Sequence, residues 1–466
     1  MDKNNKLKEK LFTARKSVWN GIAAPELKKL FDFSEGYKDF LSTSKIGREA
    51  ISYIVKTASK HGYKELHKAT KSDQKFFVNY KGSCSILANI GDKSFKNGFK
   101  IIASHVDSPQ LDLKSTALYE AEEMAYLKTK YYGGIKKYQW VTIPLAMHGV
   151  VVKKDGKLVN VVIGENEDDP VFTVNDLLIH LAQEQVTKTA NKVIEGEQLN
   201  ILVGSIPYKF KSEKDSVKLA IMDLLNKRYG IVEEDFVSAE LHLVPAGRAR
   251  DVGLDRSFVG AHGQDDRACV YTSLKALLET EKTNKNLIVI FLDKEEIGSY
   301  GDSSADSNFF ERVITNIMSL CGVKDFEKVR DVIAKSKMLS ADVTVAVDPE
   351  WKSVMDMLNS ARTGYGVTLV KSAGTRGKYN ANDTHPEFVA EMREALYKEK
   401  IKWQIGELGK VDQGGGGTVA IYFAYYGMDV IECGPALLSV HSPFEIASKA
   451  DIYNTYQAYK AFYKHC

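Results

Sequence analysis

The sequence contains no run that approaches the roughly 18 consecutive apolar residues of a membrane-spanning helix. Its opening stretch, MDKNNKLKEKLF, is polar and charged, and it lacks the apolar segment of a secretory signal. Neither charge is in strong excess, because 64 basic and 61 acidic residues leave a net charge of +3. Such a balance argues against nucleic acid as a partner. These absences predict a cytoplasmic protein that binds neither membranes nor nucleic acids.

Cysteine is also scarce in this chain. The five cysteines are dispersed, and no two of them form a CxxC pair. An odd, scattered set fits a reducing compartment better than a disulfide framework. At 466 residues, of which 44% are hydrophobic, the chain is long enough to bury a core without disulfides. We therefore expect a globular protein of one large domain or of two or three smaller ones.

The pattern of the sequence changes twice along the chain. Apolar residues recur at helical spacing in residues 6–60, and short strand-like runs follow. Residues 117–250 form a strand-rich block with two helical stretches, TVNDLLIHLAQEQV and DSVKLAIMDLLNKRYG. After this block, strands alternate with helices, which is typical of α/β layering. We therefore expect an α/β domain formed by residues 1–116 and 251–466, with residues 117–250 inserted into it.

Several side chains that bind metals occur near the ends of predicted strands. His105 and Asp107 are two residues apart in IIASHVDSPQLDLK, so on an extended chain they share a face. An imidazole that binds a metal usually has a carboxylate or a carbonyl group at its other nitrogen. A core histidine beside a turn aspartate would give the same pattern. This pair alone therefore leaves both interpretations open.

Glu295 and Glu296 are adjacent carboxylates that follow the apolar run NLIVIF. This run predicts a strand buried on both faces, and open α/β sheets bind ligands at the carboxyl ends of such strands. Adjacent glutamates also point in different directions. One of them can bind a metal while the other faces a water molecule on it.

Three other positions offer metal ligands, and each has an ordinary alternative. Asp265 and Asp266 precede a predicted helix, whose N-terminus two carboxylates could simply complement. Asp348 ends the predicted strand DVTVAVDPE, where an aspartate is common. His441 lies in a loop rich in Gly, Pro and Ser before the last predicted helix. Singly, none of these residues identifies a site.

Together, these positions make one set of two imidazoles and three carboxylates: His105, Asp265, Glu296, Asp348 and His441. This mixture suits two borderline metal ions that share a carboxylate, whereas calcium and magnesium sites are built from oxygen ligands. Two metals, one base and no protein nucleophile describe metal-assisted hydrolysis. The set therefore predicts a di-metal hydrolase.

The order HxD, DDR, EE, D and H along the chain resembles that of co-catalytic zinc exopeptidases. The length, the inserted block and the stretches ASHVDSPQLDLK, YYGGIKKYQW, LDKEEIGS and GPALLSVHSPFE are similar to the aspartyl aminopeptidase and vacuolar aminopeptidase I family. The resemblance covers most of the chain. It implies a mixed-sheet catalytic domain with helices on both faces and an inserted β-rich dimerisation domain. It also implies an aminopeptidase that removes acidic or neutral N-terminal residues from short peptides.

The resemblance further implies a role for each candidate residue. The five ligands named above would bind two zinc ions per subunit, with Asp265 as the bridge, and the same ligands would accept manganese or cobalt. Asp107 would orient His105. Glu295 would be the general base that takes a proton from the metal-bound water. In related enzymes the peptide bond between Asp265 and Asp266 is cis, and we expect a cis bond here.

The resemblance also implies a homo-oligomer, in which dimers assemble into a shell of twelve subunits. In such an assembly, His180 of the inserted block would enter the active site of a neighbouring subunit, although a histidine on an amphipathic helix is the ordinary interpretation. Arg376 and Lys378, in GTRGKY, would lie near the specificity pocket, where a cation can pair with an acidic side chain. A solvated turn is their alternative.

Two other functions are compatible with parts of this pattern. A dipeptidase or a deacylase of the same di-zinc clan would use the same metals and differ in how it binds the ends of its substrate. A binding protein on an inactive peptidase fold would have lost the base or a ligand, and this sequence retains Glu295 and all five ligands.

Overall fold

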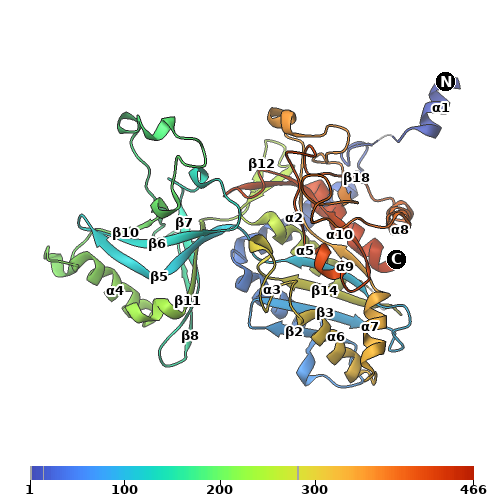
Figure 1. Cartoon of the computed structure of the whole chain (residues 1–466), viewed down its shortest axis with the longest axis horizontal. Helices are drawn as coiled ribbons and strands as arrows, with labels where there is room; N and C mark the ends of the chain where they lie inside the picture. The colour runs from blue at the N-terminus through green and yellow to red at the C-terminus, as the bar shows by residue number, and fades with distance from the viewer. Residues whose placement is uncertain (1–2, 14, 281–282) are drawn as a thin grey trace.

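The computed structural model describes residues 3–13, 15–280 and 283–466. Figure 1 shows two parts side by side, a larger one that contains both ends of the chain and a smaller one formed by its middle. The larger part is built on a nine-stranded sheet, and the smaller part on a separate seven-stranded sheet. The middle of the chain therefore forms a sheet of its own beside the one that the two ends build together.

The nine-stranded sheet is mixed, in the order β1-β2-β3-β14-β4-β15-β19-β17-β18. Its four central strands, from β14 to β19, run parallel, and the strands next to them on either side are antiparallel. Because the carboxyl ends of parallel strands meet at one edge, this edge gathers the residues that follow them. The strands are β1 (Lys64–Glu65), β2 (Lys75–Tyr80), β3 (Cys84–Ile90), β14 (Asn286–Leu292), β4 (Lys100–His105), β15 (Lys337–Ser340), β19 (Asp429–Gly434), β17 (Val367–Val370) and β18 (Trp403–Ile405).

Helices cover both faces of this sheet. Alternate residues of a strand point to opposite faces, so Ile101 packs in one core and Ile102 in the other. The core that contains Ile102 includes residues of α2 (Ala24–Thr43), α3 (Gly47–Lys60), α5 (Gln264–Leu278), α8 (Pro386–Lys398) and α10 (Lys449–His465). The core that contains Ile101 includes residues of α6 (Phe309–Leu320), α7 (Phe326–Ala334) and α9 (Ala420–Ala424). The predicted α/β class, with helices on both faces, is confirmed.

Helix α1 (Lys3–Leu11) lies at the end of the chain, away from both cores (Figure 1). Within the described ranges, no helix combines the length and the apolar character needed to cross a membrane.

The seven-stranded sheet is antiparallel throughout, in the order β8-β7-β11-β5-β6-β10-β9. One core joins its residues Leu111, Leu127 and Leu243 to Val217 of α4 (Ser216–Tyr229). The sheet begins a few residues after β4, so the loop between them links the two parts. Its strands are β5 (Gln110–Ala121), β6 (Met124–Tyr132), β7 (Leu145–Val152), β8 (Leu158–Ile163), β9 (Thr173–Val174), β10 (Ile201–Gly204) and β11 (Ala239–Pro245).

A third sheet, in the order β12-β13-β21-β20-β16, joins segments that are far apart in the sequence. Strand β13, just before α5, pairs with β21, just after the loop that holds His441. This pairing places the beginning of α5 beside that loop. The strands are β12 (Arg250–Val252), β13 (Phe258–Ala261), β21 (Glu445–Ser448), β20 (Ala436–Leu438) and β16 (Thr344–Val345).

One of the two helices predicted in the middle block is absent from the structure. The stretch TVNDLLIHLAQEQV forms β9 and two short 3-10 turns, η3 (Ile179–Leu181) and η4 (Gln185–Thr187). Its apolar side chains, such as Leu178 and Leu181, are exposed, so no packed face stabilises a helix here. The second predicted helix is confirmed as α4, and it ends where Gly230 adopts a left-handed conformation.

The predicted strand over DVTVAVDPE is also largely wrong. The strand of the large sheet is β15, Lys337–Ser340, which comes earlier in the chain. Only Thr344 and Val345 of the predicted stretch are in a strand, and that strand belongs to the third sheet. This shift changes which aspartate lies at the carboxyl edge of the large sheet.

Candidate active site

The candidate site lies at the carboxyl edge of the parallel strands. His105 is the last residue of β4, and Glu295 and Glu296 open a 3-10 turn just after β14. Asp342 follows β15 by two residues. Two other segments complete the site: the beginning of α5, and the loop before β21. The strand topology thus brings five distant pieces of the chain to one place.

Asp265 lies between two histidines. Its Oδ1 is 3.2 Å from Nε2 of His105, and its Oδ2 is 3.3 Å from Nε2 of His441. The two oxygens of one carboxylate therefore face different imidazoles, as a carboxylate shared by two metal ions requires. The peptide bond between Asp265 and Asp266 is cis, which confirms the prediction.

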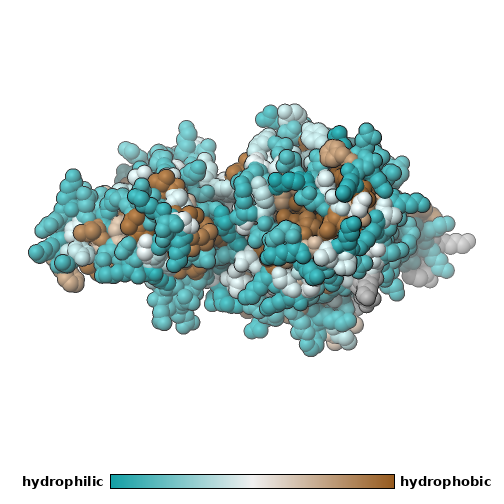
Figure 2. All heavy atoms as spheres, turned by 90° about the horizontal axis from the view of Figure 1, so that it is seen from below, coloured by the Kyte–Doolittle hydropathy of each residue, from teal (hydrophilic) through white to brown (hydrophobic). Residues whose placement is uncertain are grey.

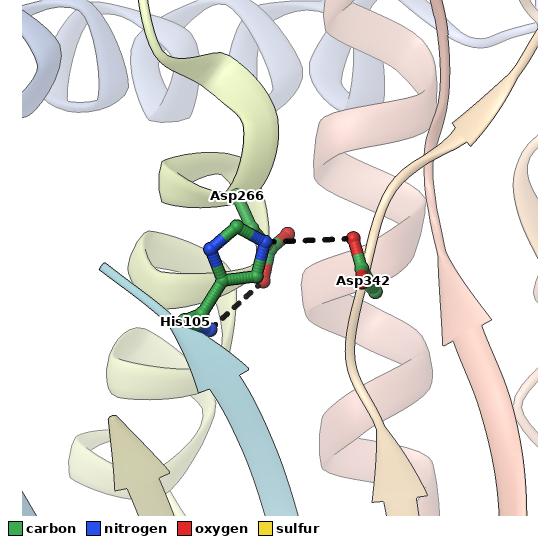
Figure 3. Close-up of side chains that lie close together, drawn as sticks. All are labelled: His105, Asp266 and Asp342. Carbon is green, nitrogen blue, oxygen red and sulfur yellow. Dashed lines mark hydrogen bonds and ion pairs between the residues drawn. The ribbon is translucent and has the colours of Figure 1, made fainter. Parts of the chain in front are cut away.

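The first candidate ligand group surrounds His105 and is drawn in Figure 3. Nε2 of His105 lies 3.8 Å from Oδ1 of Asp342. The backbone N–H of His105 donates a hydrogen bond to Oδ2 of Asp266 at 3.3 Å. One ligand atom from each of these three residues lies within 4.8 Å of the others. His105 and Asp266 are buried, and the side chain of Asp342 is only 13% exposed.

The second candidate group includes Glu296. One atom each of His105, Asp265 and Glu296 also lies within 4.8 Å of the others. Oε2 of Glu296 is 3.3 Å from Nε2 of His441. The structure therefore brings together four of the five predicted ligands.

Asp348, the fifth predicted ligand, is outside both groups. Its carboxylate accepts a hydrogen bond from the backbone N–H of Glu350 at 2.9 Å and caps the turn η9 (Pro349–Val354). Asp342 takes its place beside His105, because β15 ends just before Asp342. The apolar run before Asp348 is not the strand of the large sheet, so Asp348 does not lie at the edge where the ligands gather.

The chemistry of these side chains fits bound cations. Burial, together with the charge of Asp265, raises the pKa of Glu296 well above the usual range. Burial and the charges of Asp266 and Asp265 do the same for Asp342. Burial raises the pKa of Glu295 to about 7. Oε1 of Glu296 is buried and makes no hydrogen bond to any described residue. Bound positive ions would stabilise several buried carboxylates that lie close together, one of which has an oxygen without a hydrogen bond.

The two histidines are also suited to metal binding. Burial lowers the pKa of His441, but its hydrogen bond to Asp265 and the charge of Glu296 outweigh this effect and raise it to about 10. Nδ1 of His441 is 2.9 Å from the backbone carbonyl oxygen of Gly134, which directs Nε2 toward the carboxylates. Nδ1 of His105 is likewise 3.1 Å from the backbone carbonyl oxygen of Asp107. Each imidazole thus has an oxygen partner on the nitrogen that faces away from the site, as metal-binding histidines usually do.

The remaining predicted residues belong to neither ligand group. A cavity of about 1600 Å³ is lined by Asp265, Glu295 and Lys378 among others. Lys378 is exposed and pairs with Asp383 at 2.7 Å. Arg376 is exposed on the same turn and is not among the residues that line the cavity. His180 is exposed on η3 of the smaller part and lines a separate cavity of about 660 Å³.

The sequence prediction missed several residues that contact the candidate ligands or stand among them, including Asp342, Tyr132, Gly134 and Glu445. Asp342 follows MLSA, an apolar run that was not assigned to a strand. Tyr132 donates a hydrogen bond to Asp107 at 2.8 Å, and Gly134 contacts His441 as described above. Glu445 accepts hydrogen bonds from two ligand segments. Only Asp342 had a usable signal, because it is an aspartate at the end of an apolar run.

Comparison with known proteins is consistent with this geometry. A family model described as aminopeptidase I zinc metalloprotease (M18) matches residues 40–463. A protein from Clostridium acetobutylicum named probable M18 family aminopeptidase 1 is 52% identical over 453 residues, which cover 96% of this chain and 97% of the relative. The crystal structure of an M18 aminopeptidase from Thermotoga maritima superposes with a TM-score of 0.94 at 43% identity, covering 97% of this chain and 100% of that one. The chain therefore belongs to the M18 family and is a zinc metallo-aminopeptidase.

Proposed function

We propose that this enzyme removes N-terminal residues from short peptides, with two zinc ions bound by His105, Asp265, Glu296, Asp342 and His441. The observation that carries this proposal is the position of Asp265, whose two oxygens face different histidines. Asp342 replaces Asp348 in the predicted set for the geometric reason given above. When bound, zinc would lower the pKa of a water molecule and polarise the scissile carbonyl group, and manganese or cobalt would suit the same ligands.

Glu295 is the proposed general base. Its carboxylate lines the cavity, and its Oε2 lies 3.9 Å from Nε2 of His105. A carboxylate at this position takes a proton from the attacking water and delivers it to the nitrogen of the leaving amine. Burial already raises its pKa to about 7, which is close to the pH at which the proton must be taken and returned.

Asp107 is the proposed orienting residue. Its Oδ1 lies 3.3 Å from Nδ1 of His105, on the side of the ring that faces away from Asp265. It therefore fixes the ring and the nitrogen that carries the proton, which leaves Nε2 free to bind a metal.

The size and lining of the cavity support a short peptide with an acidic or neutral N-terminal residue. Four lysines line it, namely Lys136, Lys371, Lys378 and Lys410. Lys378 is already paired with Asp383. An acidic substrate would compete for that lysine, and Arg376, on the same turn but outside the lining of the cavity, is the other proposed contact. The apolar residues Ile405, Leu408 and Leu438 line the same cavity and would accept a neutral side chain.

Assembly is proposed to involve the smaller part of the molecule. Figure 2 shows apolar surface on this part. Its stretch from β9 to η4 exposes Leu177, Leu178, Ile179, Leu181 and Val186. A solved structure of Saccharomyces cerevisiae mApe1, which shares the fold at 21% identity, is described as a dodecamer. We propose that two copies of this chain pair through the smaller part, that the dimers form a dodecamer, and that His180 enters a neighbouring active site.

The activity test uses metal-free enzyme and a panel of aminoacyl-anilides with acidic, neutral and basic residues. Activity should vanish with a strong chelator and return with zinc, cobalt or manganese, because the five proposed ligands are imidazole and carboxylate groups that bind these metals. N-acylated amino acids and dipeptides, added as control substrates, distinguish a deacylase or a dipeptidase from an aminopeptidase. Full activity of the metal-free enzyme would refute the proposal.

The assembly test combines light scattering with a His180→Ala variant. The proposal predicts a large oligomer and a variant that binds zinc normally but turns over slowly. A fully active monomer would refute both the dodecamer and the shared site. A dodecamer whose His180→Ala variant keeps wild-type kcat would remove only the role of His180.

A further inference from the structure

Glu445 is a buried carboxylate that the proposed chemistry does not use. It is the first residue of β21 and is 1% exposed. Its Oε1 accepts a hydrogen bond from the backbone N–H of His441 at 2.8 Å, and its Oε2 accepts one from the backbone N–H of Asp265 at 3.0 Å. One side chain thus joins two segments that carry candidate metal ligands.

The bond to His441 supports an unusual backbone conformation. His441 has a φ of 63°, and Ser439, two residues earlier, has a φ of 57°. Residues with a Cβ atom rarely adopt this left-handed conformation, and they keep it only where neighbouring groups enforce it. The hydrogen bond from His441 N–H to Glu445 is one such constraint.

The bond to Asp265 acts at the beginning of α5. Backbone N–H groups at the start of a helix have no partner within the helix. Glu445 accepts a hydrogen bond from one of them, and so fixes the backbone from which the Asp265 carboxylate projects.

Glu445 is itself held in place by two contacts. It pairs with Ala261 across β13 and β21, and its backbone oxygen accepts a hydrogen bond from Nε2 of Gln264 at 2.6 Å. Its carboxylate therefore starts from a rigid position on the third sheet.

We infer that Glu445 is a positioning residue that sets the distance between the bridging Asp265 and His441 by binding the backbone of both. The inference rests on the proposed metal site. It predicts that loss of one acceptor oxygen at residue 445 lowers the affinity for zinc, in addition to any effect on the stability of the fold.

The chain offers a matched control for this prediction in Asp451. This residue of α10 is fully buried, and its carboxylate accepts hydrogen bonds from the backbone N–H groups of Gly364 and Gly366, at 2.6 and 2.7 Å. Its surroundings and its two bonds resemble those of Glu445, but its partners belong to no ligand segment.

The experiment compares Glu445→Gln and Asp451→Asn in the full-length protein. Each amide keeps one acceptor oxygen, so one backbone N–H loses its partner. Zinc affinity is measured by competition with a chelator, and the unfolding temperature is measured on the metal-free protein. Both variants should unfold at a lower temperature, but only Glu445→Gln should bind zinc more weakly, by about 10- to 100-fold, the usual effect of losing a group that positions a ligand.

The other outcomes distinguish a failure of the proposed metal site from a failure of the positioning role alone. Wild-type protein that binds no zinc would overturn the metal site and this inference with it. Wild-type affinity in Glu445→Gln, or an equal loss in Asp451→Asn, would overturn the positioning role alone, because a purely structural residue changes stability without a specific effect on zinc. If Glu445→Gln does not fold, Glu445→Asp serves the same comparison, since it keeps both oxygens but is one methylene too short to reach both N–H groups.

Discussion

The carboxylate of Asp107 accepts a hydrogen bond from the backbone N–H of Glu295, with Oδ1 at 3.2 Å. Its Oδ2 accepts a second one from the N–H of Glu296 at 3.1 Å. The same side chain lies behind His105. The buried Asp107 therefore connects the proposed base Glu295 and the proposed ligand Glu296 to His105. Substitutions at these residues should have different effects on zinc binding and turnover.

Substitutions of the adjacent Glu295 and Glu296 should affect turnover and zinc binding, respectively. Glu295→Gln keeps the shape of the side chain but cannot take a proton, so kcat should fall about 100-fold or more while bound zinc stays near normal. Glu296→Gln should instead lower zinc content, because Oε2 of Glu296 faces His441. Zinc content by elemental analysis and steady-state kinetics check both results. Equal loss of zinc in the two variants would contradict the assignment.

The two aspartates after β15 give a sharper comparison. Asp342→Asn should weaken zinc binding by about 10-fold or more, since its carboxylate lies among the proposed ligands. Asp348→Asn should leave zinc affinity unchanged, because its carboxylate only caps a turn. Chelator competition measures both affinities. The opposite order would restore Asp348 as the ligand.

Tyr132 should affect the metal site from the smaller part of the molecule. Its hydroxyl group donates to Oδ2 of Asp107 at 2.8 Å, so Tyr132→Phe removes one of the bonds that hold this carboxylate. Zinc affinity should fall by about 10-fold. Tyr131→Phe is the control, because Tyr131 is the neighbouring residue and is half exposed. Identical zinc binding in both variants would exclude a positioning role for the hydroxyl group.

His242 should make stability depend on pH. Burial lowers its pKa, but the hydrogen bond to Asp112 and the nearby carboxylate of Glu240 outweigh this and raise it to about 9. A pKa raised above the unfolded value of about 6.5 adds stability that is complete below that pH and is lost as the pH rises toward 9. We expect metal-free wild-type protein to lose up to about 3 kcal/mol of unfolding free energy over this range through His242.

Denaturant unfolding of a His242→Gln variant checks this expectation, because the variant should lack that part of the pH dependence. His67→Gln is the control, since His67 is exposed. A variant whose pH dependence matches that of the wild type would show that His242 does not titrate in this range.

The sequence by itself determined the class of the fold and most of the chemistry. Alternation of apolar runs and amphipathic stretches is a local property, and it predicted β14, α5 and α10 close to where the structure has them. The ligand types are equally local, because a histidine or a carboxylate after an apolar run lies at a strand end. His105 and Glu296 were found in this way, whereas Asp265 and His441 were found from their places before predicted helices. The structure brings all four together.

The tertiary structure alone decided which aspartate joins them and what holds them. A short apolar run joins a sheet only where a neighbouring strand pairs with it. Strand β15 pairs with β4 and β19, whereas the run before Asp348 pairs with β20 in the third sheet. Tyr132, Gly134 and Glu445 contact the site through strand pairings and loop closures between segments far apart in the chain. Such contacts depend on the register of whole sheets, which no short stretch of sequence specifies.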